Sequence, residues 1–127
     1  MTMPTRLMRF SLVFAAAAIA VTVTVAARPS DPESVKQLLK TGNCVGCNLT
    51  SEQLVNLDLA GADLTGADLS GAFLYRTVLR GAALKGAKFV GANLTGADLS
   101  GAKDADLSGA TTDNHTKCPD ATAGPCR

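Results

Sequence analysis

Tryptophan is absent from this chain of 127 residues, and aromatic side chains make up only 4% of it. A hydrophobic core built without large aromatic rings has to be aliphatic and narrow. Histidine occurs once, at His115, and the residues beside it in sequence do not form the acid and nucleophile set of a catalytic triad. We therefore expect no catalytic residues, no metal site and no cofactor, and we predict that the protein is not an enzyme.

A strong excess of charge of either sign is also missing. The formal net charge is +1, and it falls by two to −1 once Arg6 and Arg9 are removed with the leader segment described below. This balance implies neither a polycationic face for nucleic acid nor a strongly acidic face. The composition therefore disfavours a nucleic-acid partner.

Residues 1–27 are typical of a secretory signal peptide. Arg6 and Arg9 precede an apolar run over residues 10–25, and the small residues 25–27 form a cleavage site. An uncleaved membrane anchor is the alternative, because the 18 residues 10–27 come near the shortest length that spans a bilayer. The cleavage site favours an exported protein, periplasmic or extracellular, with membrane contact only if the leader is retained.

From Leu57 to Gly101 the sequence repeats every five residues through nine units. The third position of each unit is Leu or Phe, the first is nearly always small, and the fifth is Gly in all units but one. Neither a helix nor a strand has a period that places every central Leu on one side. A period of five requires a chain that turns a corner once per unit, and Gly provides the permissive backbone there. The pattern predicts a solenoid.

Units such as Ala62-Asp63-Leu64-Thr65-Gly66 and Ala67-Asp68-Leu69-Ser70-Gly71 resemble those of the pentapeptide-repeat family. The resemblance implies an all-β solenoid, a right-handed quadrilateral β-helix with four units per coil. The Leu and Ala of each unit would point inward, and the second, fourth and fifth residues outward. Including less regular units, we expect the β-helix to occupy residues 47–109, about three coils. Residues 50–56 fit either one helical turn or a degenerate unit.

Residues 28–46 are expected to form an N-terminal helical cap followed by a CxxC motif. The segment from Ser30 to Lys40 predicts a short helix, with Ser30 or Asp31 as its N-cap and Gly42 at its end. A cap is useful because an open terminal coil exposes unpaired backbone groups. One face of this N-terminal helix carries Val35, Leu38 and Leu39.

Residues 110–127 form a polar C-terminal tail that we expect to lie over the last coil or to be loosely ordered.

Four cysteines in an exported chain indicate two disulfides. If the helix end and the tail lie at opposite ends of a three-coil stack, they are ~14 Å apart, whereas a disulfide requires Cα atoms within roughly 7 Å. This geometry pairs Cys44 with Cys47 and Cys118 with Cys126. Redox catalysis by Cys44 and Cys47 is an alternative, although a redox CxxC normally begins a helix and this one follows a helix. A zinc site built from the four cysteines is disfavoured by export.

Four units per coil place each residue beside the residue twenty positions later, so Asp68 should lie next to Lys88. Among the outward positions, Phe73 replaces the usual Asp or Asn, and Arg76 replaces the corner Gly. Exposed aromatic residues beside Arg are favoured at protein interfaces. A Phe beside a Tyr could equally cover the helix cap or simply tolerate exposure. The candidate interaction surface consists of Phe73, Tyr75, Arg76 and Arg80.

The function that the sequence favours is a non-enzymatic, exported solenoid that acts as a structural or protein-interaction module. Its protein partner is not identified by the sequence. A thiol-disulfide redox protein using Cys44 and Cys47 is the first alternative. A DNA-mimicking topoisomerase inhibitor, an activity that the resemblance suggests, is disfavoured because such proteins need a long acidic solenoid in the cytoplasm.

Overall fold

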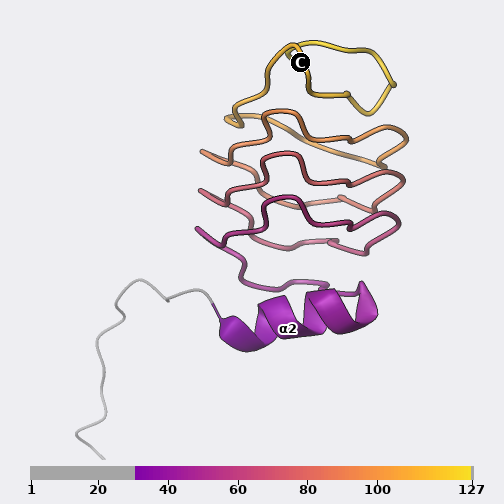
Figure 1. Ribbon diagram of the computed structural model, residues 1–127. Helices are drawn as coiled ribbons and strands as arrows, with labels where there is room; N and C mark the ends of the chain where they lie inside the picture. Colours follow the sequence, from indigo (N-terminus) through magenta and orange to yellow (C-terminus); the bar gives the residue numbers. More distant parts are fainter. Residues whose placement is uncertain (1–30, 127) are drawn as a thin grey trace, which may run out of the picture.

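A computed structural model of the chain describes residues 31–126. The expected signal peptide, residues 1–27, lies outside these residues, as does Ser30. Within the described part, helix α2 (Pro32–Thr41) lies across one end of a stack of coils, and the C-terminal segment closes over the other end (Figure 1). The long axis of the molecule is therefore the axis of the stack.

Four ladders of isolated parallel β-bridges make the walls of the stack. In the regular part each bridge joins a residue to the one twenty positions later, as in Asp68 with Lys88, so the expected register is confirmed. We name each wall after the first residue of its ladder. The Asn43 wall contains Asn43, Asp63, Ala83 and Lys103; the Asn48 wall Asn48, Asp68 and Lys88; the Gln53 wall Gln53, Phe73, Asn93 and Thr111; and the Asp58 wall Asp58, Val78, Asp98 and Lys117.

The interior of the stack is aliphatic, as the repeat predicts. Leu64, Leu69, Leu84 and Leu94 are all 0% exposed and belong to one hydrophobic cluster. Phe89 takes the Leu place in its unit at 1% exposure. A small first residue fills the space between the Leu side chains in all the units after the one that begins at Leu57, and in the fifth unit this residue is the buried Thr77. Ala62, Ala67, Ala72, Ala82, Ala87, Ala92 and Ala97 occupy these first positions.

The corners between walls use a left-handed backbone at the fifth residue of each unit. The corner glycines between Gly61 and Gly101 have φ angles between 67° and 74°. Arg76, the one non-glycine residue at these corners, has a φ angle of 55°. Left-handed backbone is unfavourable for a residue with a Cβ atom. Arg76 therefore adopts the left-handed backbone of the glycine corners, although this conformation is unfavourable for arginine.

Helix α2 begins at the N-cap Asp31, whose carboxylate accepts a hydrogen bond from the Glu33 N–H at 3.1 Å, and Gly42 ends it at a φ of 69°. Leu38 is buried and Val35 is partly buried against the core, but Leu39 is 55% exposed. The expected face was therefore wrong for Leu39. The buried face is centred between Ser34 and Leu38, and at 100° per residue Leu39 turns away from it to the flank.

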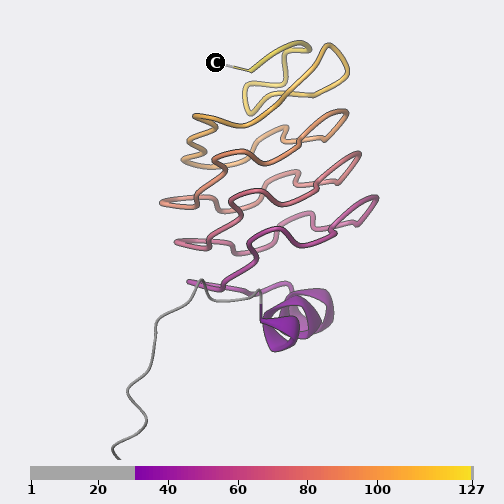
Figure 2. The same cartoon turned by 90° about the vertical axis from the view of Figure 1, so that its left-hand side faces the viewer.

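The C-terminal segment stays on the stack after the repeat pattern breaks. Lys103 still pairs with Ala83. The unit that contains it is only three residues long, because its third residue, Asp104, already makes the left-handed corner with a φ of 55°. Thr111 then pairs with Asn93, eighteen residues before it. Residues 110–126 thus lie over the last regular coil, where the chain doubles back (Figure 2).

The irregular residues 50–56 form a unit of the wall, not a helical turn. Gln53 pairs with Phe73, and the Leu54 N–H donates to the Phe73 carbonyl at 2.9 Å. Asn56 makes the corner with a φ of 59°. The degenerate-unit interpretation of this segment is therefore the right one.

Candidate interaction surface

Most units carry an Asp or Asn at the second position that fixes the backbone two residues later. The Asp63 Oδ1 atom accepts hydrogen bonds from the Thr65 N–H at 3.1 Å and from the Thr65 hydroxyl at 2.6 Å. The hydroxyl bond lowers the pKa of the Asp63 carboxyl, and the backbone bond adds to this. These acidic residues thus stabilise turns through the backbone. The same bond to the backbone N–H occurs in the units of Asn48, Asp58, Asp68, Asn93, Asp98 and Asp106.

One stretch of four consecutive units, residues 72–91, has no such turn. Its second positions are Phe73, Val78, Ala83 and Lys88, and its fourth positions are Tyr75, Arg80, Lys85 and Val90. Twenty residues make one coil, so this stretch forms a belt around the solenoid. We call it the basic coil, because it contains four cations and no acidic residue. The remaining described residues contain four cations and all eleven acidic residues.

Three of the candidate residues lie together on the Gln53 wall and its corner. Phe73 is 42% exposed and Tyr75 is 37% exposed. The Arg76 guanidinium carbon lies 5.2 Å from the centre of the Tyr75 ring, within the range of a cation–π interaction. Phe73, Tyr75 and Arg76 therefore form a continuous aromatic and cationic patch.

Arg80, the fourth candidate, lies on the next wall. Its side chain bridges to the coil above, where Arg80 Nη2 is 3.1 Å from Asp98 Oδ2, and Lys117 Nζ is 3.6 Å from the same oxygen. Burial opposes ionisation of Asp98, but the Ser100 hydrogen bonds and these two cations together lower its pKa. Arg80 consequently serves an ion pair between coils and is separate from the patch on the Gln53 wall.

A pocket of about 370 Å³ opens beside the patch. Tyr75 and Arg76 line it from the basic coil, and Asp113 and His115, which were not among the predicted surface residues, line it from the C-terminal segment. The Asp113 Oδ1 atom accepts a hydrogen bond from the His115 N–H, as the Asp of a repeat unit does from the residue two positions later. An Asp in a turn outside the regular repeat is therefore the sequence signal that marks these two residues. The end of the chain therefore contributes to a site built mainly by the basic coil.

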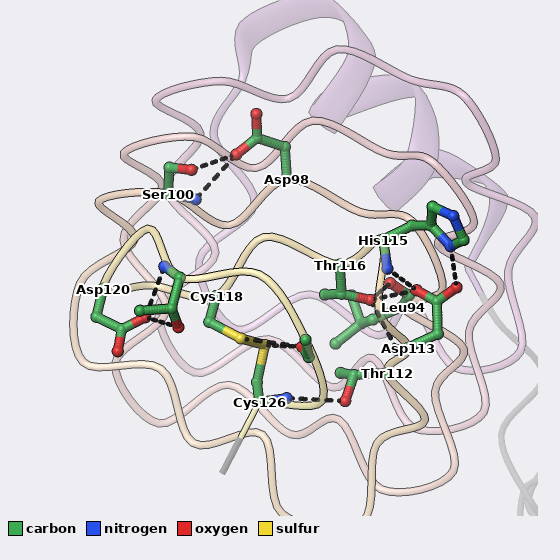
Figure 3. The surroundings of a disulfide bond; sticks show 12 residues. Leu94, Asp98, Ser100, Thr112, Asp113, His115, Thr116, Cys118, Asp120 and Cys126 are labelled. Atoms are coloured by element: carbon green, nitrogen blue, oxygen red, sulfur yellow. Dashed lines mark hydrogen bonds and ion pairs between the residues drawn. A yellow bond between two sulfur atoms is a disulfide. The ribbon is translucent and has the colours of Figure 1, made fainter.

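Both carboxylate oxygens of Asp113 have partners (Figure 3). Oδ2 lies 3.0 Å from His115 Nδ1, while Oδ1 accepts from the Gly96 N–H at 2.9 Å and from the Thr116 hydroxyl at 2.9 Å. The bond to the His115 ring contributes most to lowering the pKa of Asp113 far below its usual value, while burial acts in the opposite direction. Asp113 thus holds His115 at the rim of the pocket.

The four cysteines are paired as Cys44–Cys47 and Cys118–Cys126, with Cα atoms 5.3 and 5.4 Å apart. Cys44 is 0% exposed, and its Sγ atom lies 3.2 Å from the Ser34 carbonyl of helix α2. The second pair joins the C-terminal segment to itself (Figure 3). The two pairs therefore lie at opposite ends of the stack.

Residues 43–81 and 74–111, together more than half of the chain, match the family of pentapeptide repeats. The chain belongs to this family. Pentapeptide-repeat proteins fold as right-handed quadrilateral β-helices, in agreement with the four ladders described above. The predicted family is therefore confirmed, and the β-helix is the fold of the repeat region.

Two solved pentapeptide-repeat proteins show the similarity. One from Nostoc is 29% identical with a TM-score of 0.53, and the match covers 77% of this chain and 87% of that protein. Another, from the thylakoid lumen of Arabidopsis thaliana, is 28% identical with a TM-score of 0.42, covering 63% of this chain and 61% of that one. Among curated proteins none matches this chain at a significant level.

Residues 31–126 of this pentapeptide-repeat protein contain no cluster of three or more side chains suited to holding a metal ion. The helix in this part of the chain is also too short and too polar to cross a bilayer. The patch and the pocket beside it form the candidate functional site.

Proposed function

We propose that this pentapeptide-repeat protein is an exported, non-enzymatic module that binds a partner protein through Phe73, Tyr75 and Arg76, while Arg80 pairs with Asp98 outside this surface. The walls of the solenoid supply a rigid support, and the basic coil supplies the contact residues. Aromatic residues and Arg are the types that dominate binding energy at interfaces.

One observation carries this proposal: the basic coil lacks the turn-stabilising Asp or Asn at its second positions, and at Phe73 a bulky exposed side chain takes that place. Phe73 stands at a position where Asn93, its neighbour in the ladder, instead bonds the Thr95 N–H at 3.0 Å. An exposed Phe at this place neither fixes the turn nor enters the core. Its presence beside Tyr75 and Arg76 is best accounted for by a contact outside the chain.

The proposal includes the finer architecture of the module. The ladder Asn43–Asp63–Ala83–Lys103 supports three coils of twenty residues followed by an incomplete one. Helix α2 would close the N-terminal end and protect the first coil from pairing with another chain. Two disulfides and a leader typical of secretion support export, because disulfides persist in oxidising compartments.

Neither alternative function gains an observation in its favour. A redox protein using Cys44 and Cys47 needs an accessible thiol, and the burial of Cys44 under α2 argues against it. A DNA mimic needs a continuous acidic row, and the basic coil interrupts the acidic residues with four cations.

Crosslinking in the native compartment, followed by identification of the captured proteins, tests the proposal. The tagged protein is compared with a double variant, Phe73→Ala with Arg76→Gly, and with a matched control, Lys85→Ala with Val90→Ala, which removes exposed side chains elsewhere in the basic coil. We expect the captured protein to be lost from the first variant and kept by the control. Capture unchanged in the first variant would remove this patch as a site.

A further inference from the structure

Arg76 is the charged centre of the patch and has no anionic partner in the described part of the chain. Within residues 31–126 its one charged or aromatic contact is the Tyr75 ring, and no ion pair joins it to Asp113 across the pocket. Asp113 is already engaged by Gly96, His115 and Thr116. The guanidinium of Arg76 is therefore available to an external anion.

The Arg76 side chain has close neighbours on its own coil and on the next one. Tyr75 lies on one side of it, and on the coil above it packs so closely on Gly96 that a Cβ atom there would come within 3.3 Å of Arg76 Cγ. The backbone meanwhile retains a left-handed corner, where Gly would be more favourable. Strained residues held in place by their surroundings are concentrated at ligand sites.

Backbone groups of the wall do not take part in recognition, because they are used within the stack. The Phe73 N–H donates to Glu52 on the coil below, and the Leu74 N–H donates to Asn93 on the coil above. A partner cannot add a strand to such a wall, so side chains alone determine what binds. The chemistry of the ligand must then complement an aromatic pair and a guanidinium.

Charge selects among the anions that a guanidinium accepts. The basic coil carries a net charge of +4, against −7 for the other described residues. A carboxylate pairs with a guanidinium through two parallel hydrogen bonds. A phosphate dianion would bring more negative charge toward Asp113 and the acidic coils than a carboxylate does. The four cations also lie on different walls, so one nucleic-acid strand cannot contact all of them.

We infer that the pocket between Arg76 and His115 binds a carboxylate side chain of an acidic segment in a partner protein, with a neighbouring apolar side chain on Phe73 and Tyr75. This inference rests on the proposed function and specifies its ligand. It assigns Arg76 as the residue that binds the carboxylate. Phe73 and Tyr75 supply apolar contact area.

The test uses a fluorescent peptide in which Glu and Phe alternate, with a second peptide in which Gln replaces each Glu. Binding to the purified protein is measured by fluorescence anisotropy. We expect binding of the Glu peptide alone, and affinity lowered by about tenfold or more in Arg76→Gly. This variant restores the residue that the other corners between Gly61 and Gly101 carry, so a melting temperature equal to or above that of the wild type shows that the fold is intact.

The matched control is Lys85→Ala, which removes an exposed cation of the basic coil on another wall. Unchanged peptide affinity in this control supports the pocket, whereas an equal loss in both variants overturns it in favour of diffuse charge attraction. Equal binding of the Gln peptide, or stronger binding of a single-stranded oligonucleotide, also overturns the inference. So does self-association that Arg76→Gly abolishes, because the acidic coils of a second copy would then be the ligand.

Crosslinking separates this inference from the proposed function. If the captured partner depends on Arg76 but is not displaced by the Glu peptide, the interaction surface stands and the carboxylate site is wrong. If capture does not depend on the patch at all, the proposed function itself fails.

Discussion

The basic coil and the coils on either side of it share one interior and differ on the outside. Leu74 in the basic coil and Leu94 in the next coil are both 0% exposed, and the bridge from Phe73 to Asn93 joins the two coils in register. Outside, the flanking units use Asp or Asn to fix the turn, whereas the basic coil presents aromatic and cationic side chains. The fold therefore depends on the inward positions, and the outward positions are free to carry function.

The largest expected effect concerns the shared interior. Leu74→Ala and Leu94→Ala should each lower the free energy of unfolding by about 3 kcal/mol, because each deletes a fully buried side chain and leaves a cavity. Urea unfolding measures both values. A much smaller loss for Leu74 would mean that the basic coil is packed less tightly than its neighbours, and the common interior would be wrong.

Removal of the C-terminal disulfide should have the next largest effect. Cys118→Ser with Cys126→Ser is expected to lower stability by about 2–3 kcal/mol, because the unfolded chain regains the freedom of the closed loop. Hydrogen exchange should show protection lost in residues 112–126 and kept by the amides of the basic coil. Peptide mapping without reduction checks the pairing first; a peptide that links Cys44 to either C-terminal cysteine would contradict the arrangement.

Asp98 and Val78, neighbours in one ladder, test the outside of the two regions. Asp98→Ala should lower stability by about 1–2 kcal/mol, because it removes the acceptor for Ser100 and for two cations. Val78→Ala should change it by less than about 1 kcal/mol. Equal losses at both positions in urea unfolding would contradict the assigned role of the acidic turns.

The contribution of Asp98 should depend on pH in a defined direction. Burial acts against ionisation of Asp98, but its bonds to Ser100, with Arg80 and Lys117, lower its pKa below the usual 3.8. A carboxyl whose pKa is lower in the folded state stabilises the protein above the unfolded pKa. The difference between wild type and Asp98→Ala should therefore be constant near neutral pH and shrink as pH falls below about 4.

The smallest effect concerns the corners. Gly91→Ala should destabilise by about 1 kcal/mol, because its φ of 74° is unfavourable for Ala even though its Cβ would meet no atom closer than 3.8 Å. Arg76→Gly should leave stability unchanged or raise it by up to about 1 kcal/mol. Thermal unfolding of the two variants gives the comparison. Destabilisation by Arg76→Gly would mean that the Tyr75 stacking contributes more than the strained corner removes.

The walls and interior could be predicted from the sequence because the five-residue period is a local and repeated signal. The period placed Leu64, Leu84 and Leu94 in one core and paired Asp68 with Lys88, both of which the structure has. The face of helix α2 was predicted less well. A helix this short has few apolar residues, and its orientation is set by contact with the first coil, so Leu39 could not be placed.

The pocket could not be predicted, because it depends on where the register breaks. The left-handed corner at Asp104 shortens the last turn, and only then do Asp113 and His115 come beside Arg76. A fixed spacing of twenty would have placed Asp113 opposite Asn93 instead of Thr111. The positive charge of the basic coil was also missed, because the near-neutral net charge of the whole chain sums this coil with the acidic coils around it.

The cystine of the first coil has a consequence for how such proteins can be altered. Cys44 and Cys47 occupy the places that Leu64 and Ala67 hold one coil later, and the two corners close with similar hydrogen bonds, 3.2 Å from Cys47 to Cys44 and 3.0 Å from Ala67 to Leu64. A disulfide thus fits between the inward positions on either side of a corner, and the backbone there keeps the hydrogen bond that the other corners have. Placing the same pair of cysteines at the equivalent positions of another coil would introduce a disulfide there. A reductant could then break this disulfide, while the outward-facing residues of the coil remain unchanged.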